Sequence, residues 1–393
     1  MTEARRHGRC PPLFVEQPQL FRHVVQRCWK AIHGDAEETD AEVAVRRVED
    51  KSKGFDHFVH LLHLYDPTAS QAEEEDAVVV VLRCPRPSDK NPIMHRPSSQ
   101  AWMTTLLAQQ GVPVAKVLYL DPEDRFMVES FVGGMDLSEL QKRASKQQLR
   151  GLFVELGRHV RGMHAVATRG FGAMTHSEEN SSNASYRFQG KCNTWLEVIE
   201  PFFLHHLDSC WRQGRIREEE RTQLRAMLER HRDYLSDFSD SRLLHADLNM
   251  DNIRVIQTKQ EKPKNETREK EEEDEGKEQW KISGIIDFGD AMCGDPLYDF
   301  GEVLEEVGGD WELLLGMAEG YELFRSCERE EEKEKLLEVI RFYALVLCVW
   351  LLEWMEEKEE DEKGGALQKE DKVRYYIGCS VEEKRAVLLH LLR

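Results

Sequence analysis

The sequence lacks the features that mark a secreted or membrane-embedded protein. Its nine cysteines are scattered singly and include no Cys-x-x-Cys pair, which argues against a disulfide framework and a zinc knuckle. We therefore expect a cytoplasmic protein. The longest apolar run, residues 342–352, has 11 residues, whereas a helix that spans a bilayer needs about 20. We expect a buried helix at this run and no contact with a membrane.

Basic residues are in deficit. The 393 residues include 54 Lys and Arg against 74 Asp and Glu, a formal net charge of -20. Without a local basic cluster, such a chain repels nucleic-acid phosphates and anionic lipids, so we expect neither partner. Most of the acid excess lies in three runs, residues 73–76, 259–278 and 353–363, which are typical of solvated loops and helix ends. The charge is therefore no sign of a polycationic substrate.

The hydrophobic pattern predicts a sheet-rich part in residues 41–132. Short apolar runs separated by turn-forming residues predict strands at 43–45, 58–64, 78–82, 112–120 and 126–131. Apolar residues at helical spacing predict a helix over 98–110, with Ser98 or Ser99 as the cap and Gly111 just past its end. Residues 1–40 form an N-terminal extension that we expect to be partly helical.

From residue 133 to residue 393 the pattern becomes mainly helical. Helices are predicted over 149–164, 193–212, 218–234 and 297–306, and from 311 onward. Two strand-like runs, 253–256 and 282–286, lie on either side of a charged stretch at about 259–278. That stretch has no Val, Ile, Leu or Phe to bury, so we expect a disordered insertion.

Two short strings carry the chemistry. HADLNMDN contains Asp247 and Asn252, and DFGDAMCGDPLYD begins at Asp287. A hydroxyl that attacks the γ-phosphate of a nucleotide needs a carboxylate to orient it and accept its proton, together with metal ions that neutralise the phosphate oxygens. Asp247 fits the first role. Asn252 and Asp287 offer the hard oxygen atoms that Mg²⁺ prefers.

Two neighbouring residues have simpler interpretations. His245 is expected to hold the loop in place rather than to act in catalysis. Asp295, which precedes Pro296, either bonds the backbone of the catalytic loop or caps a turn. Each string alone is only suggestive, but the two in this order, each beside a strand-like run, indicate a phosphotransfer site.

These strings, together with LLAQQGVPVAKVLYLD, MVESFVGGMDL and EGYELF, resemble the aminoglycoside phosphotransferase family, which also includes choline and homoserine kinases. The matching segments run in the family's order over most of the chain. The resemblance implies a bilobal protein-kinase-like fold of class α+β. In that fold a small antiparallel-sheet N-lobe precedes a larger, mainly helical C-lobe, and the nucleotide binds between the lobes.

The resemblance also implies roles for single residues. Asp247 matches the family's catalytic aspartate, and Asn252 and Asp287 match its magnesium ligands. Arg83 lies where the family places the cation that binds the α and β phosphates, which is Lys in many members. Gln100 lies where the family usually offers Glu to that cation, so this departure removes the ion pair. An exposed helix residue is the alternative interpretation of Gln100.

The implied cofactors are ATP or GTP and Mg²⁺. Gly54 falls where a phosphate-covering turn is expected, but KGFDH lacks a full Gly-x-Gly-x-x-Gly and fits an ordinary hairpin equally well. Glu129 and Phe131 lie at the hinge, where the family bonds adenine through backbone groups. The identity of these two side chains therefore carries little information.

The predicted activity is ATP- and magnesium-dependent transfer of a γ-phosphate to a hydroxyl of a small molecule, such as an aminoglycoside, macrolide, choline or sugar. Only eight positions separate Asp287 from Asp295, too few for the peptide-binding segment of a protein kinase. The alternative is a pseudokinase-like module that binds a nucleotide or a partner without chemistry. Gln100 favours that alternative, whereas intact Asp247 and Asn252 disfavour it. The sequence leaves the oligomeric state open.

Overall fold

A computed structural model describes residues 18–33, 43–51, 57–65, 78–86, 95–176, 188–258, 279–355 and 380–393. Gly54 and the predicted insertion at 259–278 lie outside these residues. The chain divides into two compact units, each described here by itself. The first comprises Met1–Met135, Arg254–Ile256 and Ser283–Asp290; the second comprises Asp136–Ile253, Gln257–Ile282 and Ala291–Arg393.

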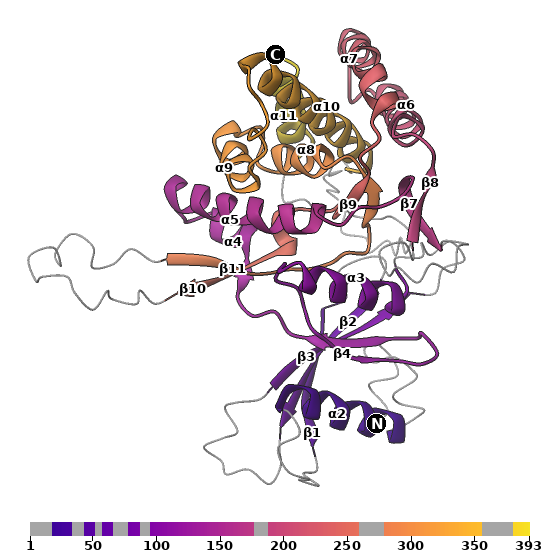
Figure 1. Cartoon of the computed structure of the whole chain (residues 1–393), viewed down its shortest axis with the longest axis vertical. Coiled ribbons are helices and arrows are strands. Elements are labelled where there is room, and N and C mark those ends of the chain that lie inside the picture. The colour runs from indigo at the N-terminus through magenta and orange to yellow at the C-terminus, as the bar shows by residue number, and fades with distance from the viewer. Residues whose placement is uncertain are drawn as a thin grey trace, which may run out of the picture. The chain divides into compact units, whose positions relative to one another are not determined.

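The first unit is built on a five-stranded antiparallel sheet in the order β1-β2-β3-β5-β4 (Figure 1). Its elements are α2 (Pro18–His33), β1 (Ala44–Asp50), β2 (His57–Tyr65), β3 (Val78–Pro85), α3 (Pro97–Gln109), β4 (Val117–Leu120) and β5 (Met127–Ser130). The predicted strands are confirmed, although β4 is shorter than predicted. Proline has no amide to donate to a sheet, so Pro113 shortens the strand at its beginning.

The core of this unit lies between α2 and one face of the sheet. Alternate residues of β2 and β3 point to this face, including Leu62, Leu64, Val80 and Leu82, each at most 3% exposed. Residues of α2, among them Cys28, pack against them. These apolar contacts with α2 stabilise the face of the sheet that α2 covers.

The start of α3 differs from the prediction. Arg96 is the N-cap and Pro97 is the first helical residue, so the predicted caps Ser98 and Ser99 already lie inside the first turn. Proline is favoured at this position because its fixed φ suits the helix and it has no amide to leave unpaired. The amide and the hydroxyl of Ser98 donate to the carboxylate of Asp124 instead. Gly111 follows the helix with φ +76°, as predicted.

A three-stranded sheet follows, in the order β11-β10-β6, formed by β6 (Met135–Asp136), β10 (Ile253–Thr258) and β11 (Gln279–Ile285). Gly134 precedes β6 with φ +111°, and the carbonyl oxygen of Val255 occupies the place that a Cβ would need. Only glycine allows this close approach. Glycine at position 134 is therefore a packing requirement.

The second unit is mainly helical, as predicted, but it also contains a four-stranded sheet that the sequence did not predict. Its helices are α4 (Leu137–Gln141), α5 (Lys146–His164), α6 (Leu196–Arg212), α7 (Glu218–Asp237), η5 (Met250–Asn252), α8 (Leu297–Glu306), α9 (Trp311–Tyr321), α10 (Glu330–Trp354) and α11 (Val381–Leu391). The sheet has the order β8-β7-β12-β9, from β7 (Phe171–His176), β8 (Phe188–Cys192), β9 (Arg242–Leu244) and β12 (Met292–Gly294).

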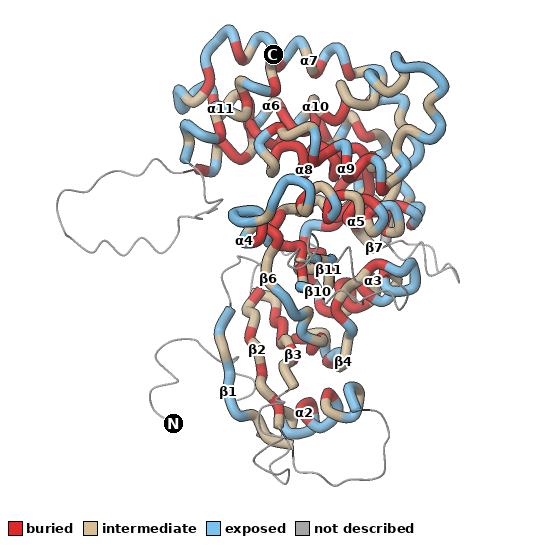
Figure 2. The backbone as a smooth tube through the Cα atoms, turned by 90° about the vertical axis from the view of Figure 1, so that its left-hand side faces the viewer, coloured by how far each residue is buried: buried red, intermediate tan, exposed pale blue. Residues whose placement is uncertain are grey.

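Helix α8 lies at the centre of this unit, and its residues Leu297 to Glu305 are all buried (Figure 2). It packs against α10, whose apolar run is the buried helix that the sequence predicts. Among the described residues, no helix combines the length and the apolar character needed to cross a bilayer.

Helices α5 and α9 approach each other backbone to backbone. A Cβ at Gly157 of α5 would meet the carbonyl oxygen of Met317, and a Cβ at Gly320 of α9 would meet that of Val154. The contact is reciprocal, because each helix contributes a glycine that faces the main chain of the other. This packing explains why glycine occurs inside two helices, where it is otherwise unfavourable.

Candidate active site

Arg83 is the centre of a buried polar cluster in the first unit. The residue is 8% exposed, and its Nη1 donates to Gln100 Oε1 and to Asp287 Oδ1, each at 3.2 Å. Its Nε lies 3.4 Å from Glu129 Oε1. One guanidinium therefore joins β3, α3, β5 and the segment that follows β11.

The strand register explains why Glu129 reaches Arg83. Arg83 pairs with Met127 across β3 and β5, and Val81 pairs with Glu129. Residues two apart on a strand share a face, so Arg83 and Glu129 are diagonal neighbours within reach of long side chains. Burial raises the pKa of Glu129 and Arg83 opposes that rise. Burial alone would lower the pKa of Arg83, but Asp287 and Glu129 raise it on balance.

Two expectations for this cluster need correction. Gln100 is 2% exposed and accepts a hydrogen bond from Arg83, so its interpretation as an exposed residue is wrong. The side chain of Glu129, expected to carry little information, forms an ion pair with Arg83. Glu129 thus supplies the carboxylate that Gln100 does not. Phe131, just after β5, is 40% exposed.

His57, the first residue of β2, was not singled out from the sequence. It is 7% exposed, and its Nε2 donates to the carbonyl oxygen of His95 at 3.0 Å and lies 3.3 Å from Gln100 Nε2. Burial, followed by the charge of Arg83, lowers its pKa to about 4. Nothing in the local sequence marks this histidine, because its neighbours come from distant segments.

In the second unit, the loop that follows β9 presents Asp247. The side-chain amide of Asn252 donates to Asp247 Oδ2 at 2.8 Å and to the Asp247 carbonyl at 2.9 Å. The amide of Asn249 donates to Asp247 Oδ1 at 2.8 Å. Both carboxylate oxygens are therefore oriented by neutral amides. The side-chain nitrogen of Asn252 makes both of its hydrogen bonds to Asp247. Its Oδ1 is therefore the atom that can bind a cation.

The backbone of this loop is bonded to carboxylates on α8. Asp299, which is fully buried, accepts from the amides of His245 at 2.9 Å and Ala246 at 3.1 Å. Glu302 accepts from the amide of Leu248 at 2.8 Å. Neither Asp299 nor Glu302 was predicted from the sequence to have a role. Their spacing of three residues on a predicted helix was the available signal, because it places both on one face.

His245 and Asp295 are both buried in the second unit. His245 Nδ1 accepts from the amide of Asp247 at 3.3 Å, a contact that suits a holding role. Asp295 Oδ1 accepts from the amide of Leu297, and its Oδ2 accepts from Tyr234 and Tyr343. These contacts fit the interpretation as a turn cap. The loop backbone is bonded by Asp299 instead.

Two residues with strained backbone lie in these segments. Ala246 has φ +59° and Asp287 has φ +64°, the left-handed region that residues other than glycine seldom adopt. Such strain persists where the surroundings fix the conformation, and it clusters at functional sites. Asp299 bonds the amide of Ala246, and Arg83 bonds the side chain of Asp287. Both strained residues thus lie within the predicted strings.

The two clusters belong to different units and are complementary in chemistry. The first has a guanidinium, the group whose planar fork binds phosphate oxygens. It also has a carboxylate, Asp287, that is 43% exposed. The second has an oriented carboxylate and an amide oxygen. The donor atoms of Asp287 and Asn252 fit a hard divalent cation such as Mg²⁺.

Several solved structures are similar to this chain. Among solved structures, the chain is similar to a thermostable mutant of aminoglycoside phosphotransferase APH(4)-Ia in a ternary complex with AMP-PNP and hygromycin B. The two are 17% identical with a TM-score of 0.48, and the match covers 79% of this chain and 86% of that one. A putative fructosamine-3-kinase from Thermobifida fusca is 14% identical, with a TM-score of 0.48 over 89% of this chain and 96% of that one.

A comparison with curated proteins found no match. The sequence profile of the phosphotransferase enzyme family (APH) matches residues 62–261 and 274–336. These two segments cover well over half of the chain and include both Asp247 and Asp287. The chain therefore belongs to the phosphotransferase enzyme family, as its motifs predicted, and is a small-molecule kinase by class.

Proposed function

We propose that this enzyme transfers the γ-phosphate of ATP, or of GTP, to a hydroxyl group of a small molecule in a magnesium-dependent reaction. The observation that carries the proposal is the state of Asp247. Its carboxylate is fixed by the amides of Asn249 and Asn252, which are uncharged and so leave its negative charge in place. A carboxylate held in this way is suited to orient a hydroxyl and accept its proton.

Asn252 and Asp287 are the proposed magnesium ligands. The amide nitrogen of Asn252 is bonded to Asp247, which directs its oxygen to a ligand, and the carboxylate of Asp287 is partly exposed. Bound magnesium would neutralise charge on the phosphate oxygens. Gly54, Glu129 and Phe131 complete the proposed nucleotide-binding residues, the last two through their backbone.

Arg83 is the proposed phosphate-binding cation. Its Nη1 donates to Gln100 and Asp287, and its Nε faces the carboxylate of Glu129 at 3.4 Å. On nucleotide binding, Arg83 would exchange its bond to Asp287 for bonds to phosphate, and Asp287 would turn to the metal. Glu129 stays beside the guanidinium in both states and keeps its charge compensated.

The acceptor is proposed to be a small hydroxylated molecule rather than a protein. Strand β12 begins at Met292, five residues after Asp287, and pairs with β7 and β9. A segment that enters a sheet so soon has no length to bind an extended peptide. An ADP-release screen across aminoglycosides, macrolides, choline, ethanolamine, homoserine and sugars would identify the acceptor class.

The decisive variant is Asp247→Asn, which keeps the shape of the side chain and removes the base. We expect acceptor-dependent ADP release to fall by roughly 10² to 10⁴-fold with nucleotide binding nearly intact. Asp251→Asn, the same change at an exposed position of the same loop, is the matched control. Unchanged turnover in Asp247→Asn would refute the proposed role.

A second candidate is a pseudokinase-like module that binds nucleotide without transfer. The presence of Gln100, rather than a helix carboxylate, beside Arg83 favours it. Both candidates predict a thermal shift with ATP and magnesium. Only the enzyme predicts ADP release that depends on an acceptor and is lost in Asp247→Asn.

A further inference from the structure

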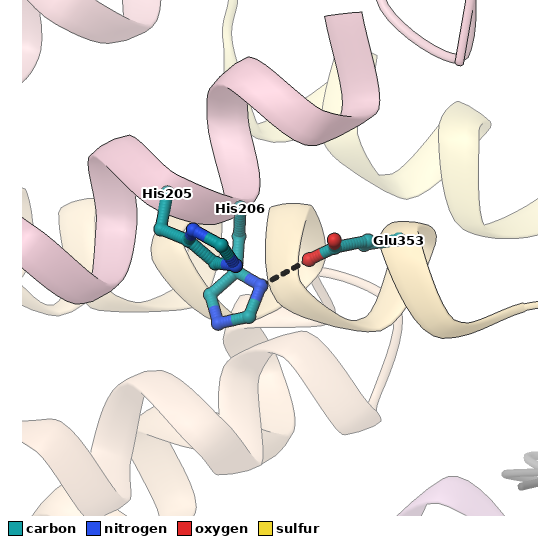
Figure 3. Close-up of side chains that lie close together, drawn as sticks. All are labelled: His205, His206 and Glu353. Carbon is teal, nitrogen blue, oxygen red and sulfur yellow. Dashed lines mark hydrogen bonds and ion pairs between the residues drawn. The ribbon is translucent and has the colours of Figure 1, made fainter. Parts of the chain in front are cut away.

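Three metal-ligating side chains meet in the second unit, apart from every residue assigned to phosphotransfer. His205 and His206 lie on α6, and Glu353 lies on α10 (Figure 3). Their ligand atoms all lie within 4.8 Å of one another. Because 147 positions separate His206 from Glu353 in the sequence, only the packing of α6 against α10 brings these groups together.

The imidazole of His206 is held in place on several sides. It is 8% exposed, and its Nδ1 forms a hydrogen bond with Glu353 Oε2. The ring of Phe202, one helical turn earlier, packs against it at a centroid distance of 4.5 Å, and the ring of His205 lies at 5.1 Å. An imidazole with so little freedom loses little entropy when it binds a ligand.

Glu353 has the charge that a metal ligand needs. Its side chain is 16% exposed, and burial alone would raise its pKa. Hydrogen bonds from Ser209 and His206, together with the charge of His205, lower that pKa on balance. A carboxylate oxygen is among the donor atoms that zinc accepts.

The nearby thiol and cation do not belong to the donor set. Cys210 donates to the carbonyl oxygen of Val349 at 3.2 Å, and burial, followed by the charge of Glu353, raises its pKa to about 12. A thiol that stays protonated is a poor ligand. Arg215 donates to the carbonyl oxygen of Leu352. Among the described residues, the metal-binding cluster thus consists of two imidazoles and one carboxylate.

We propose that His205, His206 and Glu353 bind one divalent transition-metal ion of the zinc type. Two imidazoles and a carboxylate form a common zinc ligand set, with ligand distances of about 2.0 to 2.2 Å. The metal takes the place of the proton between His206 and Glu353. Because His205 is exposed, the fourth position is open to water. The bound ion joins α6 to α10.

The test uses the full-length, tag-free chain after treatment with a chelator, titrated with ZnCl₂ in a calorimeter. We expect one zinc-binding equivalent that His205→Ala and Glu353→Gln each weaken at least about tenfold. His205 is exposed, so its replacement leaves the core packing intact. Zinc should raise the melting temperature of the parent chain and should have a smaller effect on both variants, because a ligand that binds only the folded state stabilises it.

The matched control is His159→Ala. His159 lies 3.7 Å from Glu155 on α5, a histidine and carboxylate pair one helical turn apart. Its loss should leave the zinc titration unchanged. Equal affinity and stoichiometry in the parent chain, His205→Ala and Glu353→Gln would overturn the proposal. A cobalt spectrum dominated by thiolate bands, unchanged in His205→Ala, would assign the binding to cysteine and overturn it as well.

Discussion

The two polar clusters assigned to phosphotransfer hold their shape by different means. Around Arg83 the partners are side chains, and two of the three carry a negative charge. Around Asp247 the carboxylates of Asp299 and Glu302 accept from backbone amides. Side-chain partners can be exchanged for a phosphate or a metal, whereas a backbone amide stays where the chain places it. The first cluster is therefore suited to rearrange with a ligand, and the second is suited to stay fixed.

The largest loss of stability is expected from a substitution that disrupts the cluster around Asp247. Asp299→Ala would leave the buried amides of His245 and Ala246 without their acceptor, and it would also remove a partner of His164. We expect a loss of about 3 to 5 kcal/mol in the free energy of unfolding, because buried donors lose their bonds at once. Urea denaturation would measure it. A loss below about 1 kcal/mol would show that the loop does not depend on α8.

The next prediction separates stability from ligand binding in the exchangeable cluster. Arg83→Met leaves the buried carboxylate of Glu129 uncompensated, and we expect a loss of about 3 kcal/mol and much weaker nucleotide binding. Adding Glu129→Gln removes the uncompensated charge. The double variant should regain most of the stability but not the nucleotide affinity. Recovery of both would mean that Arg83 does not contact the phosphates.

Acid should weaken the first cluster through His57. Its pKa is about 4 in the folded chain and near 6.5 when exposed, so between these values the unfolded state binds the extra proton. Stability due to His57 is therefore complete above pH 6.5 and falls as the pH drops toward 4, by about 2 kcal/mol between pH 7.5 and 5. His57→Phe should flatten the stability profile measured by thermal or urea unfolding. An equally steep profile in that variant would assign the acid sensitivity to other groups.

The smallest change in stability is expected from changing which residue, at position 100 or 129, offers a carboxylate to Arg83. Gln100→Glu adds a third carboxylate to one guanidinium, and we expect a loss of about 1 kcal/mol at pH 7. The double variant Gln100→Glu, Glu129→Gln moves the carboxylate from position 129 to position 100. It should restore the balance of charge around Arg83 and most of the stability. A double-mutant cycle of unfolding free energies measures the coupling. Additive losses would mean that positions 100 and 129 do not share Arg83.

Elements with strong local patterns could be predicted from the sequence. The strands β2 and β3 and the helix α8 have apolar residues at a clear period, and the predictions fall within a few residues of their observed bounds. The strands β7, β8, β9 and β12 were missed. They are short, and three of them contain a glycine, so their pairing depends on tertiary contacts rather than on local pattern.

The same limit applies to the candidate site. Asp247, Asn252 and Asp287 occur in short strings whose spacing indicates their chemistry. The contacts between distant segments could not be predicted, because Arg83 and Asp287 lie 204 positions apart and His245 and Asp299 lie 54 positions apart. The periodicity of apolar residues within a segment does not indicate contacts between distant segments. Glu129 was predicted as a hinge residue that acts through its backbone, and the ion pair of its side chain with Arg83 was not predicted.

The reciprocal glycines of α5 and α9 restrict how this protein can change. Alanine at Gly157 or at Gly320 would drive a methyl group into the main chain of the other helix. Both substitutions act on the same interhelical spacing, so once one has separated the helices, the second should do less further harm. The two costs are therefore expected to be less than additive, which makes the spacing of α5 and α9 one shared requirement on two glycines rather than two independent ones.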